Sequence, residues 1–289
     1  MNRRNVGHPE QSRGTSWQSL RSSYGVARLR FATLGMTLSA LALFMVTAPA
    51  ATILEETVRE SFEVDSDSTL SISNTDGSIR IYAADVTQMS LTAIKKAYTA
   101  ERLHKIDIAV TADRREVVIK TTFPAVPDNW TLKDRSGTVE YTLIVPPTTR
   151  VTKCDLVNGE VLVEGLRGGS AKAHLVNGWL SGHNCFADLD LSIVNGKLDV
   201  AYDWWENRTF SAKAESVNGS IRAIIPSDAS LKIDARSAHG HVTSALPAGD
   251  ASKDHSHAAP SLSFELGEGE GRQLRMNALH GNIKIEKAY

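Results

Sequence analysis

Val157-Asn158-Gly159 returns three times along the chain, as Val176-Asn177-Gly178, Val194-Asn195-Gly196 and Val217-Asn218-Gly219. Related triplets occur at Thr75-Asp76-Gly77, Ala238-His239-Gly240 and Leu279-His280-Gly281. The residue two positions after each glycine is aliphatic, and these residues are Ile79, Val161, Leu180, Leu198, Ile221, Val242 and Ile283. A turn that returns at a nearly fixed period is typical of stacked-repeat proteins, in which each repeat buries its apolar face against its neighbours.

The segment before each glycine alternates in polarity. Apolar or small residues stand three, five and seven positions before it. They are Leu156, Cys154 and Thr152 before Gly159; Leu175, Ala173 and Ala171 before Gly178; Ile193, Leu191 and Leu189 before Gly196; and Ser216, Ala214 and Ala212 before Gly219. A period of two residues indicates a half-buried strand rather than a helix. Asparagine and glycine tolerate positive φ most readily, so each Asn-Gly pair predicts a turn.

Two all-β architectures fit this pattern. Asn-Gly between apolar runs is a strong signal for a two-residue hairpin, which would give an antiparallel β-sandwich of Asn-Gly hairpins. The other architecture is a parallel β-helix-like solenoid with rungs of about 20 residues, whose corners stack like residue on like residue. The solenoid explains why an aliphatic residue follows every glycine at the same offset, and stacked asparagines would satisfy each other's amides. We therefore favour the solenoid and keep the sandwich as the alternative.

The solenoid predicts that the turn residues form one structural column. Its members are Asp76, Gly77, Asn158, Gly159, Asn177, Gly178, Asn195, Gly196, Asn218, Gly219, His239, Gly240, His280 and Gly281. Successive glycines from Gly159 to Gly240 are 19, 18, 23 and 21 residues apart, and the last step of 41 equals two periods or one period with an insertion. Residues 248–260 form a polar loop without periodicity, which is the visible insertion. We expect this column to be scaffold rather than a binding site.

The N-terminus has the order of a secretory signal. The first 30 residues carry six arginines, an uncharged run extends from Phe31 to Leu54, and small residues follow its most apolar part at 48–51. This order predicts a signal peptide with a long basic n-region over residues 1–51, cut after Ala50 or Ala51. An uncleaved anchor is the alternative, because 24 uncharged residues can span a bilayer. Either way, we expect the chain beyond about residue 52 to leave the cytoplasm.

Length and composition are those of an ordinary folded chain. The 289 residues are 42% hydrophobic and 22% charged, which suffices for a sizeable core. We expect residues 52–149 to form an N-terminal β-rich part with a short helix, and residues 150–289 to hold the Val-Asn-Gly strands. The formal net charge is −1, and it is −6 without the basic first 30 residues. Such a body lacks the basic surface that binding to nucleic acid requires.

The order of the segments beyond Thr57 resembles that of a known family. An early strand around Ile72–Ile81 is followed by a helix-like stretch near 95–105, by strands at 106–110 and 117–122, and by a strand at 139–145 that ends in Pro146. With the Val-Asn-Gly triplets that follow, this order resembles the bacterial putative-adhesin family of exported β-strand-repeat domains, whose function is unknown. The resemblance implies a right-handed β-helix-like fold in the periplasm or at the cell surface of a bacterium. It implies no catalytic residue.

The pair Trp204-Trp205 is the candidate binding surface. It lies in the longest step between neighbouring Val-Asn-Gly glycines, 23 residues, and Glu206-Asn207-Arg208 follow it. Neighbouring residues of a strand face opposite sides, so one indole would pack inward and the other would be free to contact a sugar or a partner protein. Packing of both indoles beneath a loop is the simpler alternative.

Two cysteines, Cys154 and Cys185, remain for an exported chain. A disulfide is one possibility, because exported proteins fold in an oxidising compartment. The other is a pair of buried free thiols, since Cys154 occupies an inward column that elsewhere holds Ile72, Ala173, Leu191, Ala214, Ala235 and Met276.

Histidines and aspartates supply weaker candidates. His239 and His241 are two residues apart on one strand face, and His280 shares the turn column with His239, so the three are weak candidates for zinc or copper ligands. Asp188, Asp190 and Asp199 would be the carboxylates of a calcium site or of a carbohydrate-active enzyme, if they converged in a groove. Outward carboxylates on a sheet face are the simpler explanation, and no cofactor is expected.

The sequence therefore favours an exported, noncatalytic protein of the cell envelope that presents a binding surface to a protein or polysaccharide. A carbohydrate-active β-helix enzyme is the first alternative, and a metal-binding envelope protein is the second. We expect function to lie where the period breaks, at 202–208 and 248–260.

Overall fold

The computed structural model describes residues 52–126, 131, 136–246, 252–254 and 260–288. The chain divides into two units, Met1–Pro49 and Ala50–Tyr289, and all described residues belong to the second. The predicted signal segment and most of the polar loop at 248–260 lie outside the described residues. Within the described part, no helix has the length and apolar composition that crossing a membrane requires.

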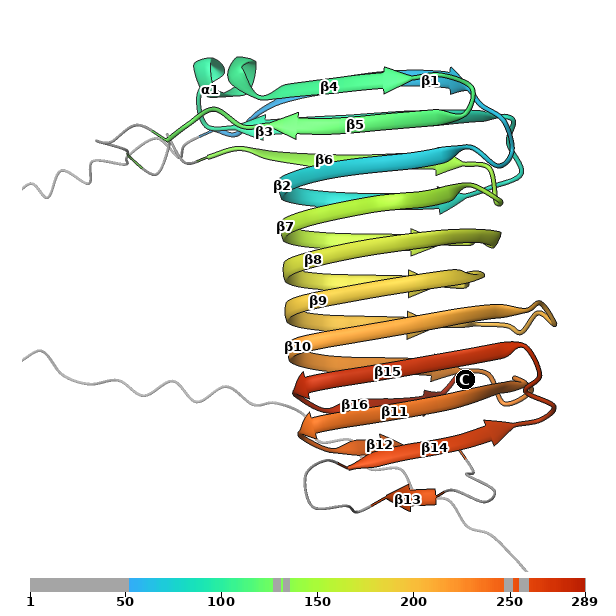
Figure 1. The fold of residues 1–289 in the computed structure, drawn as a ribbon. Helices are drawn as coiled ribbons and strands as arrows, with labels where there is room; N and C mark the ends of the chain where they lie inside the picture. Colours follow the sequence, from blue (N-terminus) through green and yellow to red (C-terminus); the bar gives the residue numbers. More distant parts are fainter. Residues whose placement is uncertain (1–51, 127–130, 132–135, 247–251, 255–259, 289) are drawn as a thin grey trace, which may run out of the picture. The chain divides into compact units, whose positions relative to one another are not determined.

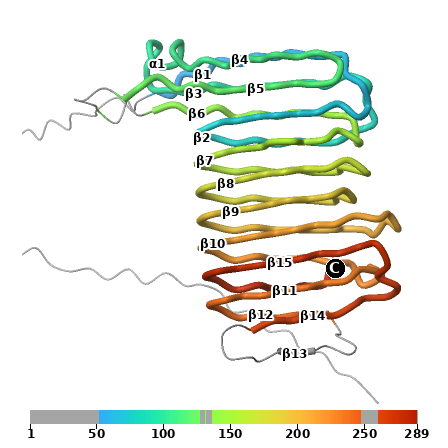
Figure 2. The backbone as a smooth tube through the Cα atoms, in the orientation of Figure 1, coloured from blue at the N-terminus to red at the C-terminus, as the bar shows by residue number. Residues whose placement is uncertain are grey.

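Five long strands carry turn-column residues through a bend without interruption. They are β2 (Thr69–Ala83), β7 (Arg150–Glu164), β8 (Arg167–His183), β9 (Phe186–Ala201) and β10 (Phe210–Ile225). Each strand bends at its corner, so that a first limb before the glycine and a second limb after it lie on two sides of the stack (Figure 1). We call the bent side the corner edge and the side that holds the connections between strands the loop edge (Figure 2).

The bent strands pair in parallel with corner on corner. Asp76 aligns with Asn158, Asn158 with Asn177, Asn177 with Asn195, and Asn195 with Asn218. A two-residue hairpin joins antiparallel neighbours, whereas these Asn-Gly pairs lie inside continuous strands with parallel neighbours. The alternative of an antiparallel sandwich of Asn-Gly hairpins is therefore wrong.

The N-terminal end of the sheet is antiparallel. The strands β1 (Leu54–Glu63), β3 (Gln88–Ala97) and β6 (Thr138–Val145) pair antiparallel in that order, and β4 (Asp107–Ala112) pairs antiparallel with β5 (Glu116–Thr122). β5 and β6 then run parallel to the two limbs of β2. The all-β prediction is confirmed, but the sheet is mixed and unclosed rather than parallel throughout.

The helix is shorter than the stretch near 95–105 predicted. α1 spans Ala100–Lys105, and Lys95 still belongs to β3, where it is largely buried. Thr99 begins the helix because its side chain accepts a hydrogen bond from the backbone N–H of Arg102.

The C-terminal strands do not stack in sequence order. They are β11 (Leu231–His239), β12 (Val242–Ser244), β13 (Ser252–Asp254), β14 (Ser261–Leu266), β15 (Arg272–His280) and β16 (Ile283–Lys287). β15 lies between β10 and β11, parallel to both, and β14 and β13 follow antiparallel beyond β11. The step of 41 residues arises because the chain runs out through β13 and β14 and then returns to fill this place (Figure 1).

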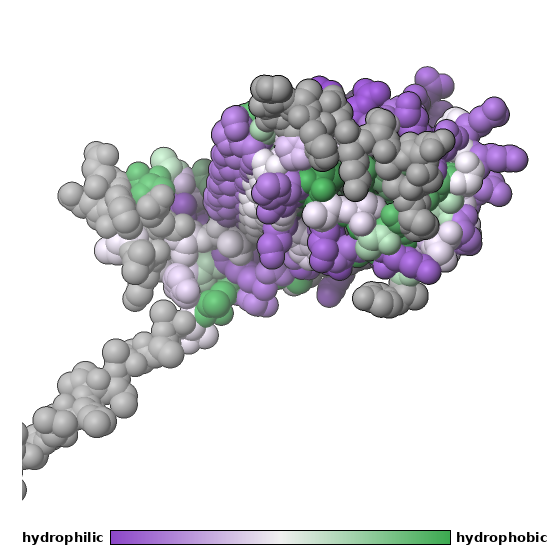
Figure 3. Space-filling view, turned by 90° about the horizontal axis from the view of Figure 1, so that it is seen from below, coloured by the Kyte–Doolittle hydropathy of each residue, from purple (hydrophilic) through white to green (hydrophobic). Residues whose placement is uncertain are grey.

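The core lies between the two limbs and is built from columns of like position. The column of Ile72, Cys154, Ala173, Leu191, Ala214, Met276 and Ala235 is in register and buried. The aliphatic residues two positions after the glycines are also buried, except Val242, which is partly exposed. Thr152 breaks the predicted pattern, since a register shift between Val151 and Cys154 turns Thr152 outward and Val151 inward. Hydrophilic side chains surround this core when the stack is viewed from the β13 end (Figure 3).

The corner glycines approach the backbone of the neighbouring corner. Gly159, Gly178, Gly196 and Gly219 have φ between 133° and 157°. A Cβ at any of these positions would overlap the carbonyl oxygen of the corner glycine in the preceding strand. The predicted positive φ therefore belongs to the glycine of each pair, and the asparagine before it keeps a negative φ.

The corner asparagines form a column of amide hydrogen bonds. Each Nδ2 donates to the oxygen of the preceding corner, from Asn218 to Asn195 at 3.1 Å, and from Asn195 to Asn177, from Asn177 to Asn158 and from Asn158 to Asp76 at 2.8 Å each. The column confirms the expectation that stacked asparagines satisfy each other's amides.

Both cysteines are buried free thiols rather than a disulfide. Cys154 lies in the core column, and the Cys185 thiol donates to the carbonyl oxygens of Val163 and His183, both at 3.3 Å. The alternative of a disulfide between them is therefore not found. Burial raises the pKa of both thiols, that of Cys185 to about 12, so neither forms a thiolate readily.

Replacing Gly178 with alanine should test the corner packing. The new side chain would meet the carbonyl of Gly159 and would also have to adopt a φ of 137°. Gly168 is the control, because it has a φ of 80° but nothing within 4 Å of an added Cβ. We expect Gly168→Ala to cost about 1–3 kcal/mol from backbone strain and Gly178→Ala about 2 kcal/mol more from overlap. Denaturant unfolding measures both, and equal losses would contradict the packing argument.

Thiol labelling should test the burial of the cysteines. We expect no reaction of the native protein with DTNB at pH 8, because the raised pKa values leave almost no thiolate and the thiols are covered. After denaturation without reductant, two thiols per chain should react. A count of zero in the denatured protein would instead indicate a disulfide.

Candidate functional site

The two tryptophans lie at the loop edge, in the connection between β9 and β10. The connection is irregular, so the predicted alternation along a strand does not apply to them. The outcome is nevertheless the expected one, since Trp204 is 45% exposed and Trp205 packs against the core.

Trp205 belongs to a cluster of four aromatic rings with Phe186, Tyr202 and Phe210. All six pairs of ring centroids lie between 5.2 and 6.0 Å apart. Edge-to-face and tilted contacts at these distances add to the stability that burial gives, so the cluster holds the backbone beneath Trp204 firmly. The hydroxyl of Tyr202 and the indole N–H of Trp205 are buried without a hydrogen-bond partner among the described residues, and burial raises the pKa of Tyr202.

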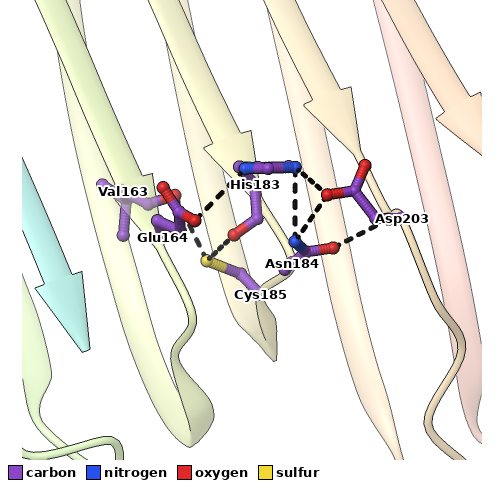
Figure 4. A network of polar contacts seen from close by, with 6 residues as sticks. All are labelled: Val163, Glu164, His183, Asn184, Cys185 and Asp203. Carbon is purple, nitrogen blue, oxygen red and sulfur yellow. Dashed lines mark hydrogen bonds and ion pairs between the residues drawn. The ribbon is translucent and has the colours of Figure 1, made fainter. Parts of the chain in front are cut away.

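A polar network fixes the residue before Trp204 (Figure 4). The ring nitrogens of His183 face Asp203 at 2.9 Å and Glu164 at 3.5 Å. Asn184 accepts a hydrogen bond from the backbone N–H of Asp203 at 2.8 Å and donates one to its carboxylate at 3.1 Å. These contacts link the ends of β7 and β8 to the connection after β9.

Asn184 supplies the turn that makes this network possible. It is the only non-glycine residue in the described part of the chain with a positive φ, which is 50°. Asparagine tolerates this left-handed conformation better than most residues. Its side chain is almost wholly buried and has both ends bonded to Asp203, which offsets the cost of the backbone conformation.

Glu206 holds the other side of Trp204. Its carboxylate lies 3.4 Å from the indole nitrogen of Trp204, and it pairs with Arg167 at 3.0 Å and with Arg208 at 3.1 Å. Exposed ion pairs contribute little to stability, but several around one carboxylate set the position of the loop. We call the exposed face of Glu164, His183, Asp203, Trp204 and Glu206 the Trp204 surface.

Cys185 lies beside this network as a buried thiol with a raised pKa. Its thiol donates to two backbone carbonyls, and a nucleophilic cysteine needs a lowered pKa rather than a raised one. The arrangement therefore suits binding, because one apolar ring is surrounded by fixed hydrogen-bonding groups.

The turn column provides no metal site in the described part of the chain. His239 and His280 stack as expected, with ring centroids 4.8 Å apart and planes 11° apart. His241 is on the next stretch of chain, where its backbone N–H donates to the side-chain oxygen of Asn282. Among the described residues, no group of three or more His, Cys, Asp or Glu side chains is arranged to hold a metal ion.

Asp188, Asp190 and Asp199 do not converge. Asp188 accepts a hydrogen bond from the backbone N–H of Ser211, and Asp190 pairs with Lys172 at 4.0 Å. Asp199 lies on the other limb of β9 and accepts a hydrogen bond from Trp179. The groove of carboxylates that the enzyme alternative required is therefore not formed by these three residues.

Sequence reasoning missed Glu164, His183 and Asn184, and it covered Asp203 only as part of the range 202–208. A signal for two of them was present, because Glu164 and His183 both stand five positions after a corner glycine and align in neighbouring strands. Asp203 directly precedes Trp204. Nothing in the sequence pattern marked Asn184, whose importance comes from its backbone conformation.

Comparison with solved structures identifies the fold. A crystal structure described as a putative cell adhesion protein from Clostridium sporogenes matches with a TM-score of 0.51 and 15% identity, over 82% of this chain and 100% of that one. A putative adhesin from Bacteroides fragilis matches with a TM-score of 0.25 and 9% identity, over 80% of this chain and 97% of that one. No family model and no curated protein sequence matches the chain. The chain thus shares its fold with the Clostridium sporogenes protein, in agreement with its resemblance to the bacterial putative-adhesin family.

Proposed function

We propose that the chain is an exported, noncatalytic protein of the bacterial cell envelope, in the periplasm or at the cell surface, with an adhesin-like role. In this proposal the bent strands act as a rigid β-solenoid, and the Trp204 surface contacts a polysaccharide or a protein of the envelope. The single observation that carries it is the exposed indole of Trp204, which directly precedes Trp205 of the four packed rings and lies between the bonded residues Asp203 and Glu206.

The chemistry of the surface favours a saccharide over a protein partner. An aromatic ring can cover the apolar face of a sugar, and the surrounding carboxylates, imidazole and guanidinium groups can bond to its hydroxyls. Because these groups are already fixed by one another, binding would require little ordering of side chains. A protein partner would need a larger apolar centre than one exposed ring gives.

Binding measurements with matched tryptophan variants test this proposal. Trp179 is the control, because it is 40% exposed and its indole nitrogen bonds to a carboxylate, Asp199, at 2.9 Å, but it lies away from the loop edge. We expect Trp204→Ala to weaken binding to immobilised cell-envelope polysaccharide about tenfold or more and Trp179→Ala to leave it unchanged.

Both variants should keep the melting temperature of the parent, since neither indole is part of the core. Equal binding by the parent and both variants would remove the Trp204 surface from the proposal. A parallel arm with envelope proteins decides between the two classes of partner, and loss confined to that arm would contradict the preference for a saccharide.

Processing of the N-terminus tests the proposed export. We expect the full-length chain, produced in a bacterium, to leave the cytoplasm and to lose residues 1–50 or 1–51, because the basic, apolar and small-residue regions stand in the order that signal peptidase requires. Intact mass and N-terminal sequencing of the exported protein measure this. A chain that stays in the cytoplasm with Met1 in place would contradict export.

A further inference from the structure

A hollow of about 440 Å³ lies at the corner edge, where the column of corner residues ends. Its walls include Ile53, Asp76, Lys96, Tyr98, Thr138 and Asn158. The hollow is far along the stack from the Trp204 surface and on the other edge, since Asp76 is in β2 and Trp204 follows β9 (Figure 1). A volume of this size is in the range of small-molecule sites.

The described residues of the next layer place no corner beyond Asp76. In that layer β5 pairs with the first limb of β2 as far as Ser73, and β6 pairs with the second limb from Gly77 onward. The sequence between the two strands, 123–137, contains no Asn-Gly pair. Thr138, the first residue of β6, lines the hollow together with Asp76. Among the described residues, no further asparagine therefore continues the column beyond Asp76.

Asp76 ends the amide column with an open acceptor. Its Oδ1 accepts from Nδ2 of Asn158 at 2.8 Å, and no described residue donates to its Oδ2. Every other hydrogen bond of the column runs from the amide N–H of one asparagine to the amide oxygen of the preceding asparagine. A carboxylate accepts but cannot donate, so the group that continues the column beyond Asp76 must bring an N–H or O–H.

The charges around the hollow disfavour an anion. The Lys96 ammonium is already paired with Glu140 at 2.8 Å and with Glu55 at 3.6 Å. Its hydrogen bond to Glu140 raises the pKa of Lys96, so it stays charged and engaged. Among the described residues that line the hollow, no further cation is then left to pair with Asp76, which favours a neutral ligand or a cation.

Two large side chains with apolar surface also line the hollow. Tyr98 is 42% exposed and Ile53 is 51% exposed, although both are large hydrophobic residues beside a cavity. A ring and an aliphatic side chain together suit a ligand with one apolar face and a small apolar substituent. N-acetylated amino sugars combine a neutral amide N–H, a methyl group and a ring with an apolar face.

We propose that this hollow binds an N-acetylated amino sugar. The acetamido N–H donates to Oδ2 of Asp76 and takes the place of the missing corner amide. The sugar ring lies against Tyr98, and the acetyl methyl group contacts Ile53. The site is separate from the Trp204 surface and does not depend on the function proposed for it.

Asp76→Asn gives a sharp test, because it leaves the column intact. Oδ1 of the new asparagine still accepts a hydrogen bond from Nδ2 of Asn158. The NH2 group of the new asparagine takes the place of Oδ2, and an NH2 group cannot accept a hydrogen bond from the ligand N–H. We expect isothermal titration of the full-length protein with N,N′-diacetylchitobiose to show binding, and Asp76→Asn to weaken it about tenfold or more, since a hydrogen bond to a charged group is lost. Tyr98→Ala should weaken it to a similar degree.

Cellobiose, which has hydroxyls in place of the acetamido groups, should bind about tenfold more weakly than the acetylated disaccharide. Trp204→Ala should leave the titration unchanged, so a failure here is distinguishable from a failure of the Trp204 surface. Asp76→Asn should still unfold in one cooperative thermal transition, which shows that the loss of binding is not a loss of fold. No binding up to about 10 mM, a concentration well above that of a weak millimolar site, would overturn the proposal. Equal binding of cellobiose, or unchanged binding by Asp76→Asn, would also overturn it.

Discussion

The close approach of the corner glycines is the constraint on which this structure depends. At Gly159, Gly178, Gly196 and Gly219 the Cα faces the carbonyl oxygen of the corner glycine in the preceding strand, where no side chain fits. Glycine leaves room for that carbonyl, so the strands approach closely at the bend and the contact sets the register of each parallel pair. Once the register is set, valine, asparagine and the aliphatic residue after the glycine each fall into a column of their own. The buried core and the amide column are both consequences of that alignment.

The same alignment decides what the sequence could predict. The corner column, the inward columns and the stacking of His239 on His280 follow from fixed offsets, and they are found except at Thr152, where the register shifts. The position of β15 between β10 and β11 could not be predicted, because every corner has the same geometry and any corner can pair with any other. The antiparallel pairing at the two ends of the sheet could not be predicted from these offsets, because most of the strands there contain no corner glycine. The turn of Asn184 depends on one backbone angle, which no periodicity reports.

The two edges of the stack differ in how much bonding capacity they leave free. Along the corner edge each asparagine uses its amide on its neighbour, so the column binds little except at an end. The loop edge has no column to maintain, and its connections differ in length and composition. That freedom allowed His183, Asp203 and Glu206 to gather around one exposed ring. A regular scaffold thus places variable chemistry at the loops, where change does not disturb the register.

The amide column also has a direction. Every asparagine donates toward Asp76, so the amide dipoles align with their N–H ends toward the carboxylate and their oxygen ends toward Asn218. Aligned amide dipoles favour an anion at the end toward which their N–H groups point. They favour a hydrogen-bond donor at the end toward which their oxygens point, as the two ends of a helix do. Asp76 stands at the donor end, and His280, whose ring can donate, is the residue in register with Asn218. The two residues that flank the asparagines, Asp76 and His280, therefore stand at the places where the aligned amides favour an acid and an imidazole.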